Sequence, residues 1–201
     1  GYPDGEQIPV DLMLDMVGRI ARAVDVPVSA DLEAGYGDAG ETIRRAIGEG
    51  VVGANLEDQL KPLHESVAAV RAAVAAADAE GVPFALNART DAWVLGRGRP
   101  RDVWVADAIE RGRAFLDEGA TCVFVPGDLD DATVAELVAG VGERRLSLIG
   151  APSVPAPARL QELGVARISY GPMPQRVALG ALRDLANDLY AWGMPPAASA
   201  R

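Results

Sequence analysis

The sequence predicts an α/β domain built on a parallel β-sheet, and three features indicate it. The 201 residues are 49% hydrophobic and 24% charged, which is typical of one globular domain with a full core. Short apolar runs alternate with longer stretches of helical spacing. Four of those stretches end in a glycine just before the next apolar run, as a helix stop requires: Glu49-Gly50, Glu80-Gly81, Glu118-Gly119 and Leu163-Gly164.

Six apolar runs are predicted as strands buried on both faces, because they are short and lack polar alternation. They are residues 26–30, 51–56, 84–88, 122–125, 146–149 and 166–169. Amphipathic stretches between and around them are predicted as helices: residues 12–24, 41–49, 65–80, 104–118, 131–141, 157–163 and 176–192. A helix in every crossover makes the sheet parallel with right-handed connections. The pattern alone fits either an open doubly wound sheet or most of an eight-stranded barrel.

Composition excludes several classes of partner. The chain has 29 acidic and 19 basic residues and a formal net charge of −10, which opposes binding to nucleic acid or to an anionic membrane. Cys122 is the only cysteine, which excludes an intrachain disulfide framework and a clustered-thiolate metal site and favours a reducing compartment. No apolar run approaches the roughly 20 residues that span a bilayer. We therefore expect a soluble, cytoplasmic protein.

Three carboxylates follow the first two predicted strands. Asp31 and Glu33 end the first strand, where alternation predicts that they project to the same side, and Glu57 ends the second. Three converging carboxylates repel one another unless a hard cation or protons neutralise them, and all-oxygen ligation suits Mg²⁺ or Mn²⁺. A divalent-cation site is therefore predicted, with simple capping of the following helices as the alternative.

The third predicted strand ends in a candidate anion ligand. Arg89 alternates in phase with Asn87, and a planar guanidinium at a metal-lined mouth is suited to bind a carboxylate or phosphonate through two hydrogen bonds. A structural salt bridge to one of the acids is the alternative. His64, the only histidine, is interpreted as a surface helix cap, and Cys122 as a core residue.

Familiar nucleotide and nucleophile motifs are missing from the sequence. It contains no Gly-x-Ser-x-Gly elbow, no Walker loop and no Gly-x-Gly-x-x-Gly after a predicted strand. The serine hydrolase, P-loop NTPase and Rossmann dehydrogenase classes are therefore excluded.

Four segments carry a family resemblance: Gly-Tyr-Pro-Asp at 1–4, Ala-Asp-Leu-Glu-Ala-Gly-Tyr-Gly at 30–37, Asn-Leu-Glu-Asp at 55–58 and Asn-Ala-Arg-Thr-Asp at 87–91. In order and spacing they resemble the isocitrate lyase/phosphoenolpyruvate mutase superfamily, in its phosphonomutase-like branch. The resemblance covers nearly the whole chain and implies the (β/α)8 barrel of that superfamily. Relative to it, the first two strands are expected to be missing from this chain. We expect one barrel domain over residues 1–192, followed by a Pro- and Ala-rich tail over 193–201.

The resemblance also implies roles for individual residues. Asp31 would be the principal Mg²⁺ (or Mn²⁺) ligand, and Glu33 and Glu57 would hold the metal mostly through water. Asp4 matches an aspartate beside the substrate, and Arg89 an arginine that binds an anionic group; both are candidate catalytic residues. The substrate-binding set implied in this way is Arg89, Asp31, Gly35, Tyr36 and Asn87.

Departures from the family pattern limit the expected activity. The lyases carry a Lys-x-Cys-Gly-His segment after the Glu-Asp strand, whereas this chain runs Gln-Leu-Lys-Pro-Leu-His at 59–64 and has no cysteine there. The mutases carry a Lys-Thr-Asn segment in that loop and a histidine after the sixth strand, where Pro126 stands here. Isocitrate lyase and phosphoenolpyruvate mutase activities are therefore not expected.

Two functions from different classes stay open. The first is an Mg²⁺-dependent enzyme that breaks a C–C or P–C bond in a small 2-oxo acid or its enol or phosphono analogue, through a metal-stabilised enolate. The second is a metal-dependent 2-oxo acid binding protein that has lost turnover. The resemblance also implies a homo-oligomer, commonly a tetramer.

Overall fold

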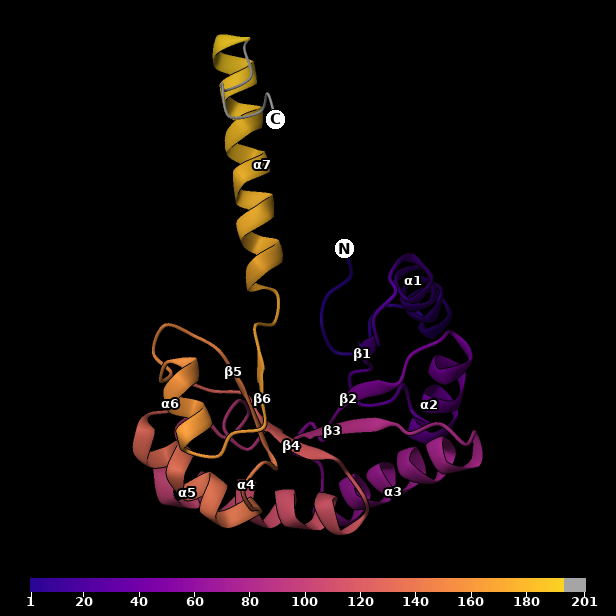
Figure 1. Cartoon of the computed structure of the whole chain (residues 1–201), viewed down its shortest axis with the longest axis vertical. Coiled ribbons are helices and arrows are strands. Elements are labelled where there is room, and N and C mark those ends of the chain that lie inside the picture. Colours follow the sequence, from indigo (N-terminus) through magenta and orange to yellow (C-terminus); the bar gives the residue numbers. More distant parts are fainter. Residues whose placement is uncertain (194–201) are drawn as a thin grey trace. The chain divides into compact units, whose positions relative to one another are not determined.

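The computed structural model describes residues 1–193, and within them helices and strands alternate along the chain (Figure 1). The strands are β1 (Ser29–Asp31), β2 (Gly53–Glu57), β3 (Ala85–Arg89), β4 (Cys122–Val125), β5 (Leu146–Ile149) and β6 (Arg167–Ser169). The helices are α1 (Val10–Ala23), α2 (Ala39–Gly48), α3 (Leu63–Ala79), α4 (Arg101–Asp117), α5 (Asp131–Val141), α6 (Pro157–Glu162) and α7 (Met173–Trp192). Every strand and helix predicted from the sequence is confirmed.

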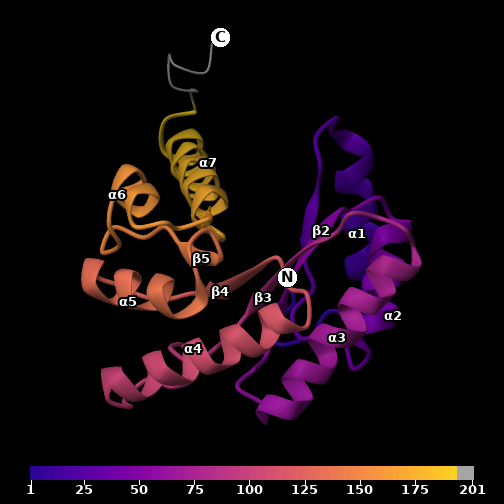
Figure 2. The same cartoon turned by 60° about the horizontal axis from the view of Figure 1, so that its bottom comes forward.

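The six strands form one curled sheet in chain order, β1-β2-β3-β4-β5-β6. The pairs from β1–β2 to β4–β5 are parallel, as predicted. Because consecutive parallel strands lie side by side, their carboxyl ends meet along one edge, which we call the C-terminal rim. Helices α2 to α6 cover the outer side of the curled sheet (Figures 1 and 2).

Local chemistry accounts for the small shifts in element boundaries. Strand β1 begins at Ser29 and not at the predicted residue 26, since Pro27 has no N–H to donate to a sheet. Helix α2 begins at Ala39, because the Asp38 side chain caps it by accepting a hydrogen bond from the Glu41 N–H at 3.0 Å. The four predicted stop glycines all have positive φ, between 66° and 99°.

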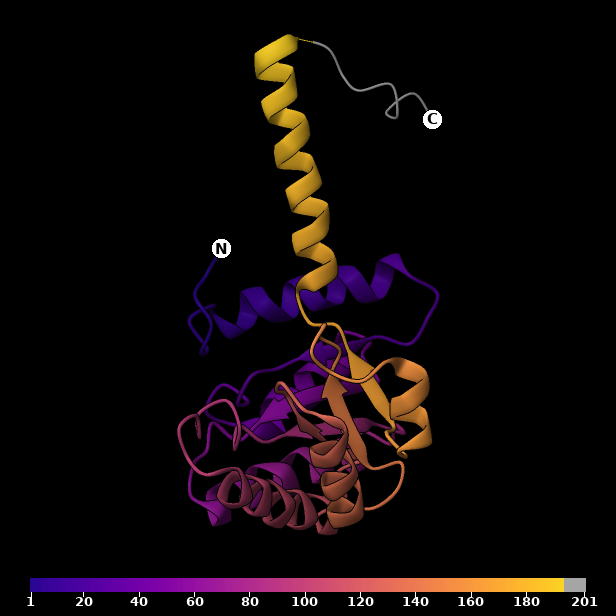
Figure 3. The same cartoon turned by 90° about the vertical axis from the view of Figure 1, so that its left-hand side faces the viewer.

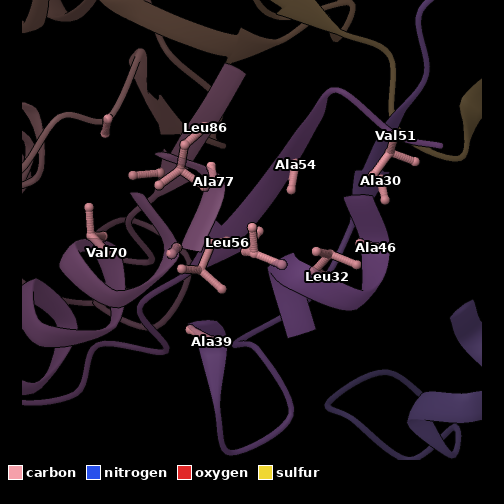
Figure 4. Packing of buried hydrophobic residues seen from close by; sticks show 14 of the residues in the cluster. Ala30, Leu32, Ala39, Ala46, Val51, Ala54, Leu56, Val70, Ala77 and Leu86 are labelled. Carbon is pink, nitrogen blue, oxygen red and sulfur yellow. The ribbon is translucent and has the colours of Figure 1, made fainter. Parts of the chain in front are cut away.

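The core lies between the outer face of the sheet and the helices. Alternate side chains of β2 and β3, among them Leu56 and Leu86, are buried there against α2 and α3, and Figure 4 shows this packing. Helix α1 packs on α2 at the β1 edge of the sheet (Figure 1), and Figure 3 shows α1, the indigo helix near the N-terminus, along its length. The residues that alternate with the core set face the inner side of the sheet, and there they are largely polar: Asp31, Asn55, Glu57, Asn87 and Arg89.

By its own contacts the chain groups into two units, Gly1–Ile168 and Ser169–Arg201. In the second unit, α7 ends at Gly193 in a left-handed conformation (φ 70°) and exposes several apolar side chains, including Val177, Leu182 and Tyr190. The single barrel domain over residues 1–192 stays a prediction, and most of the expected tail lies outside the described residues. Within residues 1–193, no helix is long and apolar enough to cross a membrane.

Candidate functional site

Strand register places the predicted site residues in two rows near the C-terminal rim. Asp31 pairs with Asn55, and Asn55 pairs with Asn87. Two positions further along the strands, Glu57 pairs with Arg89. The side chains of both rows share one face, because successive residues of a strand alternate between faces. Parallel register therefore gathers three of the predicted functional residues, Asp31, Glu57 and Arg89, from three strands.

Arg89 lies between two carboxylates. Its Nε donates a hydrogen bond to Asp91 Oδ1 at 2.7 Å, and its Nη1 forms an ion pair with Glu57 Oε2 at 2.9 Å. Burial raises the pKa of Glu57 to about 7, although the charge of Arg89 opposes the rise. The structural salt bridge considered as an alternative for Arg89 is therefore present. It uses two of the five guanidinium N–H donors, so it leaves donors for a ligand.

A buried ionic network anchors the loop that carries Asp91, one of the two partners of Arg89. Asp58 Oδ1 accepts hydrogen bonds from the N–H groups of Asp91 and Leu60, both at 2.9 Å, and Asp58 Oδ2 pairs with Arg111 Nη1 at 3.1 Å. Arg111 in turn pairs with Asp107 at 2.8 Å. The side chains of Asp58 and Arg111 are 2% and 10% exposed, so these charges are satisfied by one another and hold the loop that carries Asp91.

Sequence reasoning missed this network. Asp58 and Asp91 stand inside the quoted motifs, next to Glu57 and close to Arg89, and that adjacency was the available signal. Arg111 lies 53 residues from Asp58, so only the tertiary structure brings the two together.

Glu33 differs from its predicted placement. Strand β1 ends at Asp31, and Glu33 lies beyond it in a turn with a φ of 48°, so strand alternation does not orient its side chain. Glu33 accepts hydrogen bonds from the Glu6 N–H and from the Tyr36 hydroxyl, the latter at 3.2 Å. The Tyr36 N–H donates to the Glu6 carboxylate, so Glu6 is joined to the turn after β1 by two hydrogen bonds.

Asp31 is the least engaged of the three carboxylates. Its recorded side-chain hydrogen bond is a long one, in which the Glu33 N–H donates to Oδ1 at 3.3 Å. Its surroundings raise its pKa through burial, and the neighbouring charges of Glu33 and Asp4 add to the rise. The pKa of Asp91 is also raised, mainly by burial, and the charge of Asp4 adds to that rise. The structure thus brings Asp4 into electrostatic range of the rim.

Asn87 and Gly35 have contacts within the protein. Asn87 is buried and its Nδ2 donates to Asn55 Oδ1 at 2.7 Å, while its own Oδ1 is buried without a hydrogen-bond partner. Such an orphaned acceptor calls for a donor, which a ligand or water would supply.

Gly35 has a structural role in the turn after β1. Its N–H donates to the Leu32 carbonyl, and its carbonyl accepts from the Thr42 hydroxyl. A Cβ at Gly35 would lie 2.8 Å from Ala39 Cα, so the turn after β1 needs this glycine.

The donor set suits a hard divalent cation in its chemistry. Asp31, Glu33 and Glu57 offer oxygen ligands alone. Burial raises the pKa of both Asp31 and Glu57, and the charges of neighbouring carboxylates add to the rise, a repulsion that a cation would relieve. The three are not preassembled, however: in the part of the chain that the structure describes, no three His, Cys, Asp or Glu side chains lie close enough to hold a metal ion. Glu33 faces Tyr36 and Glu57 faces Arg89, so both would have to turn.

A small cavity of about 150 Å³ lies beside the ion pair. Its wall includes Glu57 and Arg89 from the strand ends, Gly37 from the turn after β1, and Lys61 and Glu65 near the start of α3. The wall also includes the core side chains of Leu56, Val70 and Phe115, so the cavity lies between the strand ends and the helices, and Asp31 is not part of its wall.

The chain matches a known family over nearly its whole length. A family model described as phosphoenolpyruvate phosphomutase matches residues 1–190. The chain belongs to this family.

Curated and solved relatives agree with the family assignment. The probable 2-methylisocitrate lyase 2 of Corynebacterium glutamicum is 28% identical over 220 residues, which cover 92% of this chain and 69% of that protein. A phosphonomutase candidate from Burkholderia cenocepacia J2315 is 37% identical with a TM-score of 0.87, covering 94% of this chain and 79% of that one. Oxaloacetate acetylhydrolase in complex with the product oxalate is 27% identical with a TM-score of 0.84, covering 98% and 71%.

These relatives confirm the family and the fold predicted from the motifs. The phosphomutase-family neighbours are β/α barrels, and the described sheet is the corresponding curled, six-stranded parallel sheet. The family comprises lyases, mutases and hydrolases, so this chain is an enzyme-family member of the lyase or mutase type. The predicted roles of individual residues rest on the geometry above and on the resemblance.

Two minor candidates lie away from a catalytic position. The His64 side chain is 83% exposed in the first turn of α3, as predicted for a surface residue. The predicted capping role is wrong, because Pro62 occupies the N-cap position and no side chain caps this helix. Cys122 is half-buried on β4, and burial raises the pKa of its thiol, which does not favour a nucleophile.

Proposed function

We propose that this phosphomutase-family chain binds a small 2-oxo carboxylate, or its enol or phosphono analogue, together with Mg²⁺ or Mn²⁺. It would then break the C–C or P–C bond next to the carbonyl. The observation that carries the proposal is the arrangement of Asp31, Glu57 and Arg89 at the ends of three consecutive parallel strands. Two carboxylates and one guanidinium on one rim suit a cation and an anion held side by side.

In this proposal the carboxylates bind the cation and Arg89 binds the substrate anion. Asp31 would hold the cation, with Glu33 and Glu57 supporting it mostly through water. A bound divalent cation would stabilise the enolate that develops when the bond breaks. Arg89 would orient the substrate anion through its free N–H donors, and Asp4 would lie beside the substrate. Asn87 Oδ1 offers a buried acceptor for a donor group on the ligand.

The relatives support a substrate of this class. Their names include a probable 2-methylisocitrate lyase and an oxaloacetate acetylhydrolase whose structure holds the product oxalate. Both substrates are small di- or tricarboxylates, and oxalate places two carboxylates at chelating distance. Oxalate is therefore a suitable probe of the site, because it can chelate a cation and also bind a guanidinium.

A second function remains because the loop after β2 lacks the cysteine that the resemblance assigns to the lyases as general acid. In the loop after β2, Lys61 is exposed and its backbone carbonyl accepts a hydrogen bond from Arg111, while His64 points to solvent. Without a proton donor the same site would make a metal-dependent 2-oxo acid binding protein. The lack of that cysteine, with only Lys61 and the exposed His64 in its place, is the observation that favours this alternative.

The decisive experiment is a turnover screen combined with binding. Oxaloacetate, 2-methylisocitrate and phosphonopyruvate are incubated with the protein in Mg²⁺ and in EDTA, and oxalate binding is measured by calorimetry in both. Mg²⁺-dependent turnover supports the enzyme. Mg²⁺-dependent oxalate binding without turnover supports the binding protein, and the absence of both would contradict the proposed function.

Two further proposals concern the whole protein. We propose a cytoplasmic location, which fractionation of the native host would test. We propose a homo-oligomer, a tetramer by family resemblance, which light scattering would test.

A further inference from the structure

Arg89 has two acidic partners, and they are held very differently. Asp91 is 4% exposed, accepts a hydrogen bond from Nε at 2.7 Å, and has its own N–H anchored on Asp58 at 2.9 Å. Glu57 is 14% exposed, contacts Nη1 at 2.9 Å, and its other oxygen has only a long contact to Gln59 Nε2 at 3.4 Å. Asp91 is therefore a fixed partner of Arg89, whereas Glu57 is one that can leave.

An incoming anion must compete with Glu57 for Arg89. A carboxylate binds a guanidinium best through two parallel N–H donors, and the pair Nη1 and Nη2 is the edge left open by Asp91. Glu57 sits at Nη1, so it blocks or weakens half of that edge. Replacing Glu57 by the ligand carboxylate exchanges one charge-assisted contact for another and leaves the charge on Arg89 compensated.

Glu57 also ends its strand on the same rim as Asp31. In the sheet, β2 lies between β1, which carries Asp31, and β3, which carries Arg89. Its carboxylate is thus central, between Asp31, the proposed cation ligand, and Arg89, the proposed anion ligand. Negative charge that Glu57 shares with a cation is no longer fully available to Arg89, so a bound cation weakens the ion pair between Glu57 and Arg89.

We propose that Glu57 is a shared ligand that couples the two halves of the site. In the metal-free protein it occupies Arg89 and suppresses anion binding; when a divalent cation takes Glu57, Nη1 is released and the substrate anion binds. This inference rests on the proposed function and adds an order to it, with the cation before the anion. Because binding linkage is reciprocal, the anion must raise the affinity for the cation by the same factor.

A purely structural role for Glu57 predicts the opposite effect on anion binding. If Glu57 were a permanent brace like Asp91, removing its charge would loosen Arg89 and weaken anion binding under all conditions. A shared ligand predicts a gain: without metal, the Glu57→Gln variant should bind oxalate about tenfold more tightly than wild type, since one charged competitor is lost. In Mg²⁺ the same variant should lose much of the enhancement that wild type shows.

The test is calorimetric titration of oxalate into metal-free protein in EDTA and into protein with Mg²⁺. Glu65→Gln is the matched control: Glu65 lines the same cavity and loses the same charge, but it is 55% exposed, and its ion pair is with His64 and not with Arg89. The gain should appear in Glu57→Gln and not in Glu65→Gln. It should vanish in the double variant Glu57→Gln/Arg89→Met, because Arg89 is the group set free.

The outcomes separate this inference from the proposed function. If wild type binds oxalate in Mg²⁺ but Glu57→Gln gains nothing in EDTA, or if Glu65→Gln gains as much, the shared-ligand proposal is overturned while the proposed function stands. If wild type binds no oxalate in Mg²⁺, both the shared-ligand proposal and the proposed function are contradicted. Should Glu57→Gln fail to fold by circular dichroism, Glu57→Asp replaces it; this side chain is one methylene shorter and retracts from Arg89, and the same gain is expected.

Discussion

Glu57 and Arg89 lie directly opposite each other as the last residues of β2 and β3, and their side chains meet at 2.9 Å. The register of two parallel strands therefore sets an ion pair at the centre of the C-terminal rim. Because parallel strands end at the same edge, the pair lies where β/α barrels place their chemistry.

Removing the Asp31 carboxylate should abolish metal-dependent ligand binding. In Asp31→Ala, oxalate affinity measured by calorimetry in Mg²⁺ should fall to the level seen in EDTA, because the principal cation ligand is gone. Glu33→Gln should weaken binding without unfolding the protein. Asp117→Asn, at the exposed end of α4 on the opposite edge of the sheet, is the control. Unchanged binding in Asp31→Ala would remove the metal site from the proposal.

Arg89→Lys should weaken oxalate binding while keeping the charge. A lysine cannot contact Asp91 and a ligand carboxylate with a planar fork, so the loss should be about 1.5–3 kcal/mol, the range for a hydrogen bond to a charged group. Calorimetry in Mg²⁺ measures it, and Arg113→Lys on the exposed face of α4 controls for the substitution type. Wild-type affinity in Arg89→Lys would mean that the anion binds elsewhere.

The metal-free protein should lose stability as pH rises toward neutrality. Burial raises the pKa of Glu57 from 4.5 to about 7, so between these values the folded state binds more protons than the unfolded state. Stability from this group is therefore full below pH 4.5 and is lost as pH rises through 7. Urea unfolding in EDTA at several pH values should show a flatter profile for Glu57→Gln than for wild type. Parallel profiles would mean that Glu57 titrates normally.

Breaking the buried network should destabilise the protein strongly. Arg111→Met leaves Asp58, 2% exposed, without its cationic partner, and such a loss typically costs about 3–5 kcal/mol of unfolding free energy. Urea unfolding measures it. The comparison is Arg19→Met, which breaks an ion pair with Asp15 whose side chains are 65% and 46% exposed and which should scarcely change the midpoint. Equal effects in the two variants would contradict a structural role for Asp58.

Cleavage of isocitrate or 2-methylisocitrate should be at most a trace. These reactions need a proton delivered to the departing enolate, and general acid catalysis contributes about 10²–10⁴-fold. The loop after β2 offers only Lys61 and the exposed His64 in place of a cysteine. Steady-state assays in Mg²⁺ should therefore give turnover well below about 1 s⁻¹, the lower end for ordinary enzymes. A rate at or above that value would show that another residue donates the proton.

Much of the fold could be predicted from the sequence, because the signals for it are local. Short apolar runs, helical periodicity and the stop glycines lie within a few residues of the elements they define, so each strand and helix was predicted with boundary errors of a few residues. The rim was predictable for the same reason: once the strands are parallel and consecutive, Asp31, Glu57 and Arg89 must end on one edge.

The sequence by itself therefore determined which residues reach the rim, and the tertiary structure decided what each of them contacts there. Nothing in the chain order shows that Glu57 faces Arg89, that Glu33 turns to Tyr36 and Glu6, or that Asp58 pairs with Arg111 across 53 residues. Those pairings depend on side-chain rotamers and on packing between segments distant in sequence. A carboxylate binds whichever donor the folded chain brings within about 3 Å, and only three-dimensional packing selects that donor.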